Sequence, residues 1–374
     1  MGLIDFFAGL GLIEDLVIDV CKKFRASWMV MDALNHKCPN LRSLKLGHFL
    51  TLCRAIGSQL DGLALCNRLT SLSLKNSPDL TDFRLIAIGR GCSVLKKLEI
   101  HGCNHVTTSG FRTVSCLLSK TLVDVSISDC RNLTAEVSLQ AVDPIRHQIK
   151  RLHIDCVWEV IQQQDLLDLS EEEMERLEFL SLWIPVGEKI IHLTQAGLVE
   201  CPKLTEIHIK VEGDCRQRPI PPMLSFGLGP LNRFPNMVKM KLDLGETIGY
   251  ALTAPSGYMD LSLWERFYLH GIAELGNQLR ELDYWPPQDR DVNQRSLSLP
   301  AAGLLAQCGS LRKLFIHGTA HEHFMNFLLR IGNLRDVQLR EDFYPAHADD
   351  MSTEMRVDSC CRFEENLNQR AIPD

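Results

Sequence analysis

One short phrase returns along the chain at an almost fixed interval, and this period constrains the fold more than any other feature. The phrase is an apolar residue, two further residues, an apolar residue, one further residue and a third apolar residue. Its first copies begin at Ile13, Leu41, Leu69, Leu95 and Leu122, which lie 28, 28, 26 and 27 residues apart. A period of about 20 to 29 residues with this phrase is typical of leucine-rich repeats, in which stacked units share one core.

Further copies of the phrase follow the first five through most of the remaining chain. They begin at Ile149, Leu177, Leu204, Met237, Leu279, Leu311 and Leu334. Because side chains switch faces at each residue of a strand, the apolar residues of one phrase share a face. The sequence therefore predicts an α/β leucine-rich-repeat solenoid of about twelve repeats, with a curved parallel sheet on its concave face and helices on its convex face.

The period also sets the expected domain organisation. Residues 1–12 form a non-repeat start, residues 13–341 form the solenoid, and residues 342–374 form a C-terminal loop and helix. A solenoid grows by adding units, so the length of 374 residues fits one elongated domain. The first repeat begins too early for a capping unit to precede it, and we therefore expect a chain that is the carboxy-terminal part of a longer protein.

Charge and cysteine usage restrict the class of protein. The net charge of −7 argues against a nucleic-acid partner, since such proteins normally carry a basic face. Many of the fourteen cysteines, among them Cys38, Cys66 and Cys92, occupy matching places in the repeats, which favours small buried thiols in a reducing compartment. Acidic residues interrupt the apolar N-terminus, so neither a signal peptide nor a membrane span is predicted.

Helix signals occur between the strands. Thr81 offers an N-cap for a helix whose apolar residues Phe83, Ile86 and Ala87 have helical spacing. Another helix is expected to begin near Thr319. Asp260 precedes a longer amphipathic stretch with the apolar residues Leu261, Trp264, Phe267, Tyr268 and Leu275.

Three segments break the period: residues 155–176, 204–237 and 237–279. Insertions in repeat arrays often lie on the binding face. Tolerated surface loops are the other interpretation, because a longer loop costs little free energy.

Large side chains gather on the expected concave face of the later repeats. The residue between the second and third apolar positions of a phrase, and the residue after the third, should point to that face. Small and polar residues dominate these places early, whereas Trp183, Trp285, Phe315 and Arg340 occupy them late. Trp and Arg are the commonest interface anchors, so we predict that these four residues bind a protein partner. Alternatively, the aromatic side chains pack against the long loops beside them.

No motif for catalysis, metal or cofactor binding is complete. His317, His321 and His323, with Cys308 nearby, resemble a ligand cluster but lack zinc-finger spacing and a CxxC pair. The chain contains neither a phosphate-binding loop nor a nucleophile elbow. We therefore predict a protein that is not an enzyme and uses no metal or cofactor.

Several long runs resemble one known family. They include Lys150-Arg-Leu-His-Ile-Asp-Cys-Val-Trp158, Leu180-Ser-Leu-Trp183, Ala251-Leu-Thr-Ala-Pro255, Asp260-Leu-Ser-Leu-Trp-Glu-Arg-Phe267, Leu282-Asp-Tyr-Trp-Pro-Pro-Gln-Asp-Arg-Asp291 and Met351-Ser-Thr-Glu-Met-Arg356. These runs are not generic repeat consensus. From about Ile13 to Asp374, the chain resembles the plant F-box/leucine-rich-repeat proteins of strigolactone and karrikin signalling, the More Axillary Growth type.

The resemblance implies a function in protein degradation. It implies the substrate-receptor subunit of a nuclear SCF-type ubiquitin ligase, which engages an α/β-hydrolase hormone receptor and directs Clp-ATPase-like repressor proteins to degradation. A Skp-type adaptor would bind only through an F-box, and this sequence contains none. Neither a nucleic acid nor a membrane is an expected partner. The alternative function is a stand-alone repeat protein that inhibits or regulates a partner without ligase assembly.

The resemblance also implies that the last helix is a mobile element that contacts the hydrolase. The matching segment here runs from Arg362 to Arg370, followed by the terminal Asp374. Phe363 and Leu367 lie four residues apart and form a narrow apolar stripe. We therefore expect Phe363, Leu367, Arg370 and Asp374 to bind the partner. A static C-terminal cap over the last repeat is the competing interpretation.

Overall fold

The chain divides into two compact units in the computed structural model. The first unit comprises Met1–Leu180 and Ala196–Cys201, and the second comprises Ser181–Gln195 and Pro202–Asp374. The structure describes residues 3–7, 9–20, 28–54, 59–156, 174–187, 198, 201–220, 227–250, 255–258, 260–289, 294–339, 354–355 and 369–370.

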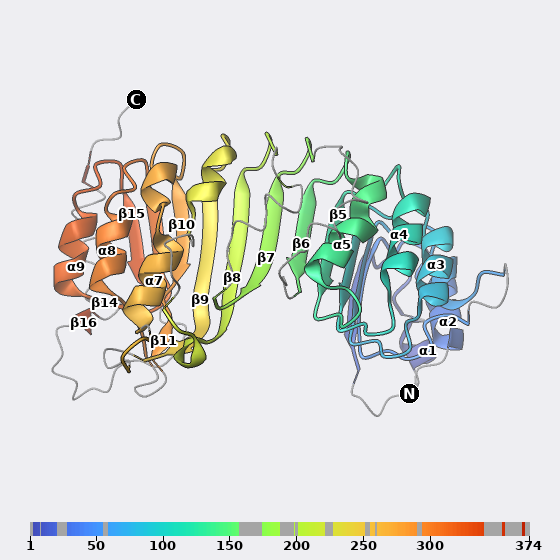
Figure 1. Ribbon diagram of the computed structural model, residues 1–374. Helices are drawn as coiled ribbons and strands as arrows, with labels where there is room; N and C mark the ends of the chain where they lie inside the picture. The colour runs from blue at the N-terminus through green and yellow to red at the C-terminus, as the bar shows by residue number, and fades with distance from the viewer. Residues whose placement is uncertain are drawn as a thin grey trace. The chain divides into compact units, whose positions relative to one another are not determined.

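Every phrase of the first unit that begins before residue 150 forms a strand (Figure 1). The strands are β1 (Asp15–Asp19), β2 (Ser43–Gly47), β3 (Ser71–Lys75), β4 (Lys97–His101), β5 (Asp124–Ser128) and β6 (Arg151–Asp155). Consecutive strands pair in parallel, so that Leu72 of β3 aligns with Leu98 of β4 and Val125 of β5. This alignment stacks equivalent apolar residues into one buried row, as the period predicts.

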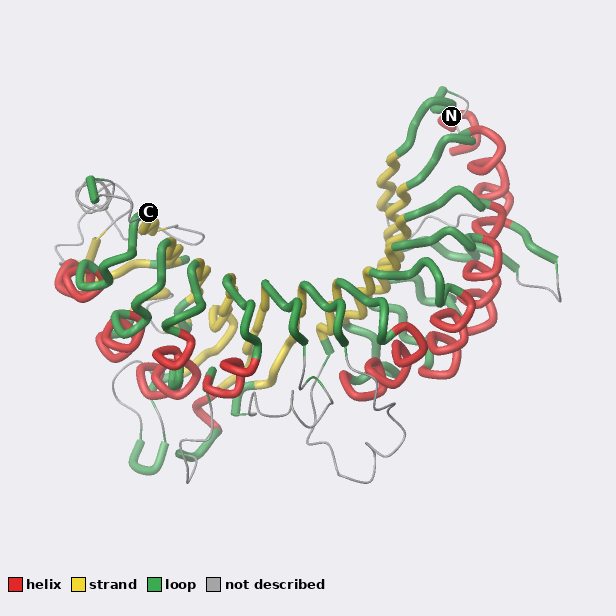
Figure 2. The backbone as a smooth tube through the Cα atoms, turned by 90° about the horizontal axis from the view of Figure 1, so that it is seen from above, coloured by secondary structure: helices red, strands yellow, loops and turns green. Residues whose placement is uncertain are grey.

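Helices cover one face of this sheet, and we call the other face of each unit's sheet its open face (Figure 2). The helices of the first unit are α1 (Leu3–Phe7), α2 (Trp28–Lys37), η1 (Gly62–Leu65), α3 (Asp82–Gly91), α4 (Thr108–Leu117), α5 (Ala135–Val142) and η2 (Asp143–Ile145). The open face corresponds to the face that the sequence predicts as concave.

The helix predicted after Thr81 exists as α3, and its buried residues differ from the apolar residues whose spacing predicted it. Phe83 is 79% exposed, whereas Leu85 and Ile88 are each 1% exposed. The buried face of α3 meets α4, where a Cβ atom on Gly89 would lie 3.3 Å from Val114. Both sets of apolar residues have helical spacing, and packing against the next repeat selects one of them.

The remaining phrases form strands that belong wholly or mainly to the second unit. These strands are β7 (Phe179–Pro185), β8 (Glu206–Asp214), β9 (Lys239–Gly249), β10 (Glu281–Trp285), β13 (Lys313–Ile316) and β15 (Asp336–Leu339). From β8 to β15 they pair in parallel in the order β8, β9, β10, β13 and β15. The predicted leucine-rich-repeat fold is therefore confirmed within each unit.

The irregular repeats of the second unit add a second ladder of strands. Its members are β11 (Gln288–Asp289), β12 (Gln294–Leu297), β14 (Thr319–His321) and β16 (Glu354–Met355), and it extends from the far end of β9. The expectation of a helix from Thr319 is thus corrected. Thr319 and Ala320 pair with β12, and α9 (Glu322–Leu328) begins only after β14.

Helices and short 3-10 turns also connect the strands of the second unit. They are η4 (Cys215–Gln217), η5 (Gly229–Arg233), α7 (Leu261–Leu269), η6 (Ile272–Leu275) and α8 (Leu299–Leu305), in addition to α9. The helix α7 begins where the sequence predicts, because Asp260 Oδ1 accepts a hydrogen bond of 2.8 Å from the backbone N–H of Leu263. Within the described residues, no helix has the length and apolar character that crossing a membrane requires.

Candidate partner-binding surface

Two rows of side chains cross the open face of the second unit. The first row runs along neighbouring strands as His208, Lys241, Asp283, Phe315 and Gln338. In the second row, Lys210, Asp243 and Trp285 are aligned, and His317 follows the end of β13. These are the rows that the repeat period predicts, and they bring Trp285 and Phe315 onto adjacent strands.

Trp285 lies between two side chains from the strands on either side. Its ring stacks on His317 with the ring centroids 3.5 Å apart and the planes 8° from parallel. Lys241 Nζ lies 4.3 Å from the centroid of the Trp285 ring, a distance typical of cation–π contacts. His317 is only 5% exposed, so the Trp285 ring packs on a buried imidazole. The indole of Trp285 is therefore held in one orientation before any partner arrives.

The charge of Lys241 is not neutralised within the described part of the chain. Neighbouring lysines have acidic partners: Lys210 lies 3.3 Å from Glu212, and Lys239 lies 3.5 Å from Glu206. Lys241 forms no ion pair with any described carboxylate. Among the described residues, the ammonium of Lys241 contacts only the face of the Trp285 indole. The ammonium therefore remains available to a charged group of another molecule.

The nearest residues of the two rows do not neutralise the charge of Lys241. Asp243 Oδ1 accepts a hydrogen bond of 2.9 Å from the backbone N–H of Gly245. Asp283 Oδ1 is buried without a hydrogen-bond partner among the described residues. His208 is hydrogen-bonded to Glu206 at 2.7 Å, and burial lowers the pKa of its imidazole more than Glu206 raises it. A neutral His208 therefore adds no competing positive charge beside Lys241 at neutral pH.

The open face of the first unit has a different chemistry. Lys97 forms ion pairs with Glu99 at 2.7 Å and with Asp124 at 3.6 Å, and Arg151 lies 3.9 Å from the same Asp124. The described row residues of this face are small, charged or histidine side chains, apart from Val17, and they include no Trp, Tyr or Phe. Within the described surface, the aromatic anchors that favour protein binding therefore lie on the second unit.

Comparisons with known proteins show which proteins the chain resembles. No protein-family model matches the chain. The whole chain aligns at 54% identity with 60% of the F-box protein MAX2 of Arabidopsis thaliana, and at 53% identity with 60% of the F-box protein MAX2 homolog B of Petunia hybrida. Over its full length, the chain is similar to part of the plant F-box MAX2 proteins. Its likeness to the F-box/LRR-repeat MAX2 homolog of Oryza sativa subsp. japonica is 50% over 56% of that protein.

The homology to MAX2 proteins confirms the resemblance found in the sequence. The chain spans about 60% of the length of these curated relatives. Among solved structures, the leucine-rich-repeat-containing protein LegL7 from Legionella pneumophila covers 96% of this chain and 99% of its own length, at 11% identity and a TM-score of 0.48. That likeness is too distant to support an inference about function.

Three of the predicted anchors lie on the open face of the second unit. Trp183, Trp285 and Phe315 are each half-buried there, and Trp183 Nε1 has no hydrogen-bond partner among the described residues. Arg340, Phe363, Leu367 and Asp374 lie outside the described residues. For all of these positions, a role in partner binding stays a prediction.

Arg370 is described, and its guanidinium contacts the unit's own backbone. Nη1 donates to the carbonyl oxygen of Ile331 at 2.7 Å and to that of Leu334 at 3.3 Å, and Nη2 donates to Leu329 O at 2.5 Å. Arg370 thus ties the C-terminal segment to the turn before β15. Partner binding by Arg370 stays a prediction as well.

Sequence reasoning missed two members of the surface. Lys241 stands in the predicted row, but a lysine at a surface position carries no special signal until its missing ion pair is known. The sequence places His317 in the second row and suggests an incomplete metal-ligand cluster, but it does not reveal that the His317 ring stacks on Trp285. Within the described residues, no group of three or more side chains is placed to hold a metal ion.

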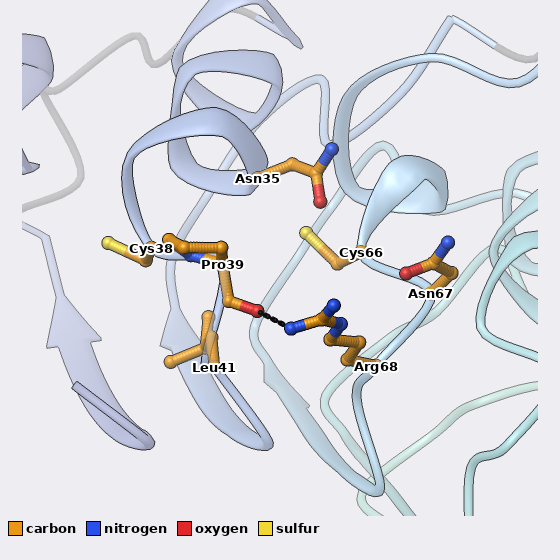
Figure 3. Close-up of a pocket in the computed structure, with 7 residues that line it drawn as sticks. All are labelled: Asn35, Cys38, Pro39, Leu41, Cys66, Asn67 and Arg68. Atoms are coloured by element: carbon orange, nitrogen blue, oxygen red, sulfur yellow. Dashed lines mark hydrogen bonds between the residues drawn. The ribbon is translucent and has the colours of Figure 1, made fainter. Parts of the chain in front are cut away.

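Cavities in the first unit offer little for a small ligand. Figure 3 shows the first, of about 170 Å³, which is lined by Asn35, Cys38, Pro39, Leu41, Cys66, Asn67 and Arg68. Arg68 Nη1 donates to the carbonyl oxygen of Pro39 at 3.1 Å across the repeat junction. Burial raises the pKa of the Cys66 thiol to about 12, so this thiol is neutral and a poor nucleophile at physiological pH.

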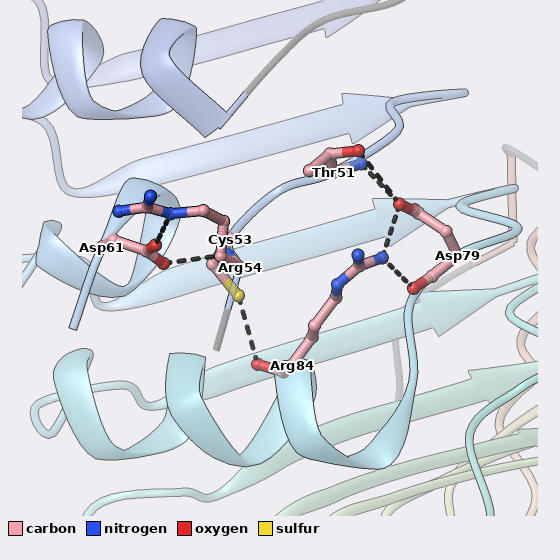
Figure 4. A network of polar contacts seen from close by, with 6 residues as sticks. All are labelled: Thr51, Cys53, Arg54, Asp61, Asp79 and Arg84. Carbon is pink, nitrogen blue, oxygen red and sulfur yellow. Dashed lines mark hydrogen bonds and ion pairs between the residues drawn. The ribbon is translucent and has the colours of Figure 1, made fainter. Parts of the chain in front are cut away.

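A second hollow, of about 480 Å³, has Arg54, Arg84 and the exposed Phe83 among its lining residues. Figure 4 shows the guanidinium groups of Arg54 and Arg84 directed to different carboxylates rather than toward each other. Arg54 Nε lies 2.7 Å from Asp61 Oδ2, and Arg84 Nη1 lies 2.5 Å from Asp79 Oδ2. Each arginine pairs with an acidic residue close to it in the sequence, and the two guanidinium groups do not converge on one ligand.

Proposed function

We propose that the chain is the leucine-rich-repeat, partner-binding part of the substrate receptor of an SCF-type ubiquitin ligase. It acts in strigolactone or karrikin signalling in the nucleus. Its partner on the open face of the second unit is an α/β-hydrolase hormone receptor, and the proteins directed to degradation are Clp-ATPase-like repressors. The names of the MAX2 relatives, which describe F-box proteins, support the ligase context.

The observation that carries this proposal is the fixed Trp285 stack on the open face of the second unit, with Phe315 on the adjacent strand. A rigid, half-buried aromatic ring flanked by polar residues is the usual form of an interface hot spot. Such a surface works by binding, since an indole, an imidazole and an ammonium in this stack supply no activated nucleophile. The proposed contribution of the chain is therefore recognition.

The first experiment measures binding of the chain to the α/β-hydrolase receptor in the presence of hormone by biolayer interferometry. Trp285→Ala is expected to weaken binding roughly 30-fold, equivalent to about 2 kcal/mol, because it removes the central anchor. Phe83→Ala is the matched control, since Phe83 is 79% exposed on α3 and lies on the helix-covered side. Equal binding by Trp285→Ala and the unaltered chain would contradict the proposal.

A second experiment separates ligase assembly from a stand-alone regulatory function. The native protein is immunoprecipitated from plant extract with an antibody against this chain, and the co-purifying proteins are identified by mass spectrometry. Recovery of a Skp-type adaptor and a cullin supports the receptor function. Recovery of the hydrolase without either ligase subunit would instead support a repeat protein that regulates its partner directly.

A further inference from the structure

We propose that the ammonium of Lys241, held over the face of Trp285, receives a carboxylate of the partner protein. The segment that docks on the open face of the second unit would then present an aspartate or a glutamate to this stack. This inference rests on the proposed function and specifies the chemistry of the partner's contact.

The first support is the fixed position of the charge. A free lysine side chain loses much rotamer freedom when it forms an ion pair, which reduces the gain in binding free energy. Lys241 Nζ already lies 4.3 Å from the Trp285 centroid, and His317 holds the other face of the indole. Part of the ordering cost is therefore met before the partner binds.

The second support is the missing counter-ion. The other lysines near it on this face, Lys210, Lys239 and Lys313, each lie within 3.5 Å of a glutamate oxygen. Lys241 has no such partner among the described residues, although the sequence places acidic residues on both neighbouring strands. Complementary charge from a partner is the arrangement that interfaces commonly use for orientation and specificity.

The third support is the geometry around the indole. His317 and Lys241 occupy its two faces, so a partner meets the edge of the ring rather than a face. The Nε1–H group on that edge forms no hydrogen bond with the described residues. Both the ring edge and the ammonium are donors, and an acidic side chain supplies only acceptors. A carboxylate therefore complements the stack better than a hydroxyl or an amide.

The surroundings favour a single acidic side chain over a polyanion. Asp283 pairs in register with Lys241, and Asp243 pairs in register with Trp285. Glu246 also lies on β9, the strand of Lys241 and Asp243, and its carboxylate is 3.5 Å from Arg295. A nucleic acid backbone or an anionic membrane would meet these carboxylates, and the net charge of −7 would repel it further.

The test uses the full chain and the hormone-bound α/β-hydrolase receptor as the probe, with affinity measured in 50 and 300 mM NaCl. Lys241→Met keeps the aliphatic stem over Trp285 and is expected to weaken binding about tenfold at low salt. It should also flatten the dependence of affinity on salt, a change that lost packing alone does not produce. Lys241→Glu should weaken binding by more than Lys241→Met. Lys45→Glu, an exposed lysine on the open face of the first unit, is the matched control.

Charge reversal then identifies the partner's group. Surface aspartates and glutamates of the hydrolase are changed to lysine one at a time and tested against Lys241→Glu. Recovery of at least tenfold in affinity for one pair supports the inference. If Trp285→Ala weakens binding while Lys241→Glu and Lys241→Met do not, the carboxylate contact is overturned and the proposed function stands. If none of these variants weakens binding, both proposals fail.

Discussion

A single buried carboxyl group joins three elements of the second unit. Glu265 of α7 is 1% exposed, and it accepts a hydrogen bond from the hydroxyl of Tyr284 in β10. Ser298, the N-cap of α8, is hydrogen-bonded to it as well. Burial raises the pKa of Glu265 to about 7, although these hydrogen bonds oppose the rise. Tyr284 stands at the third apolar place of its phrase, and Glu265 explains how that place accommodates a hydroxyl group.

The raised pKa of Glu265 makes stability depend on pH. The folded protein holds the Glu265 proton more tightly than the unfolded chain does. The stabilisation that this proton gives is therefore complete below the unfolded pKa of about 4.5 and is lost as pH rises through about 7. Glu265→Gln removes the titration and keeps an acceptor. Between pH 5.5 and 8, the unfolding free energy of the unaltered chain should fall relative to that of Glu265→Gln, by on the order of 2 kcal/mol.

Urea denaturation followed by circular dichroism at both pH values measures this difference. Glu246→Gln provides the control, because Glu246 is exposed and its replacement should leave the pH dependence nearly unchanged. A constant difference between Glu265→Gln and the unaltered chain across this range would show that Glu265 does not titrate there.

The cap of α7 shows how one residue fixes an element. Asp260 Oδ1 accepts hydrogen bonds from the backbone N–H of Leu263 at 2.8 Å and from the hydroxyl of Ser262 at 2.6 Å. The helix it starts carries Tyr268, whose hydroxyl accepts a hydrogen bond of 2.9 Å from the backbone N–H of Gly187. Through α7, the cap thus supports the segment that follows β7.

Removing this cap should weaken the second unit. Asp260→Ala leaves the first N–H groups of α7 without their acceptor and is expected to lower the unfolding free energy by about 1 kcal/mol. Asp260→Asn is the matched variant, since its amide oxygen can still accept the hydrogen bond, and it should lose much less. Chemical denaturation compares the three proteins, and equal losses by the two variants would point to the charge rather than the cap.

Elements differed in how well the sequence predicted them. Strands followed directly from the period, because each phrase buries the same positions against the same neighbours in the next repeat. The spacing of apolar residues in α3 did not define its buried face, because Phe83 and Leu85 lie on different faces and only packing against α4 selects between them. Thr319 was assigned to a helix because its pairing with β12 depends on a segment more than twenty residues earlier.

At the scale of the whole molecule, the candidate surface was predictable in position but only partly in chemistry. The repeat period predicted that Trp285 and Phe315 lie on neighbouring strands of the open face, since one register holds throughout β9, β10 and β13. The role assigned to Lys241 depends on which carboxylates reach it, and the role of His317 depends on ring stacking. Both are properties of side-chain placement, which a pattern of residue types does not encode.

A repeat architecture also predicts that a destabilising substitution affects mainly its own repeat and the neighbouring repeats. In a solenoid, each repeat contacts its neighbours, so stability is a sum of repeat and interface contributions rather than one global quantity. Leu98 of β4 and Leu314 of β13 are both buried in the apolar row, at 1% and 0% exposure. Replacing either with Ala leaves a cavity and should cost about 2 to 5 kcal/mol in its own unit.

Hydrogen exchange measured by mass spectrometry reports where that loss occurs. Leu98→Ala should speed exchange in β3, β4 and β5, while the amides of β10, β13 and β15 keep their rates. Leu314→Ala should give the reverse pattern, so each variant is the control for the other. Uniformly faster exchange through both units in either variant would mean that the chain unfolds as one cooperative body, and a nearest-neighbour account of its stability would then be wrong.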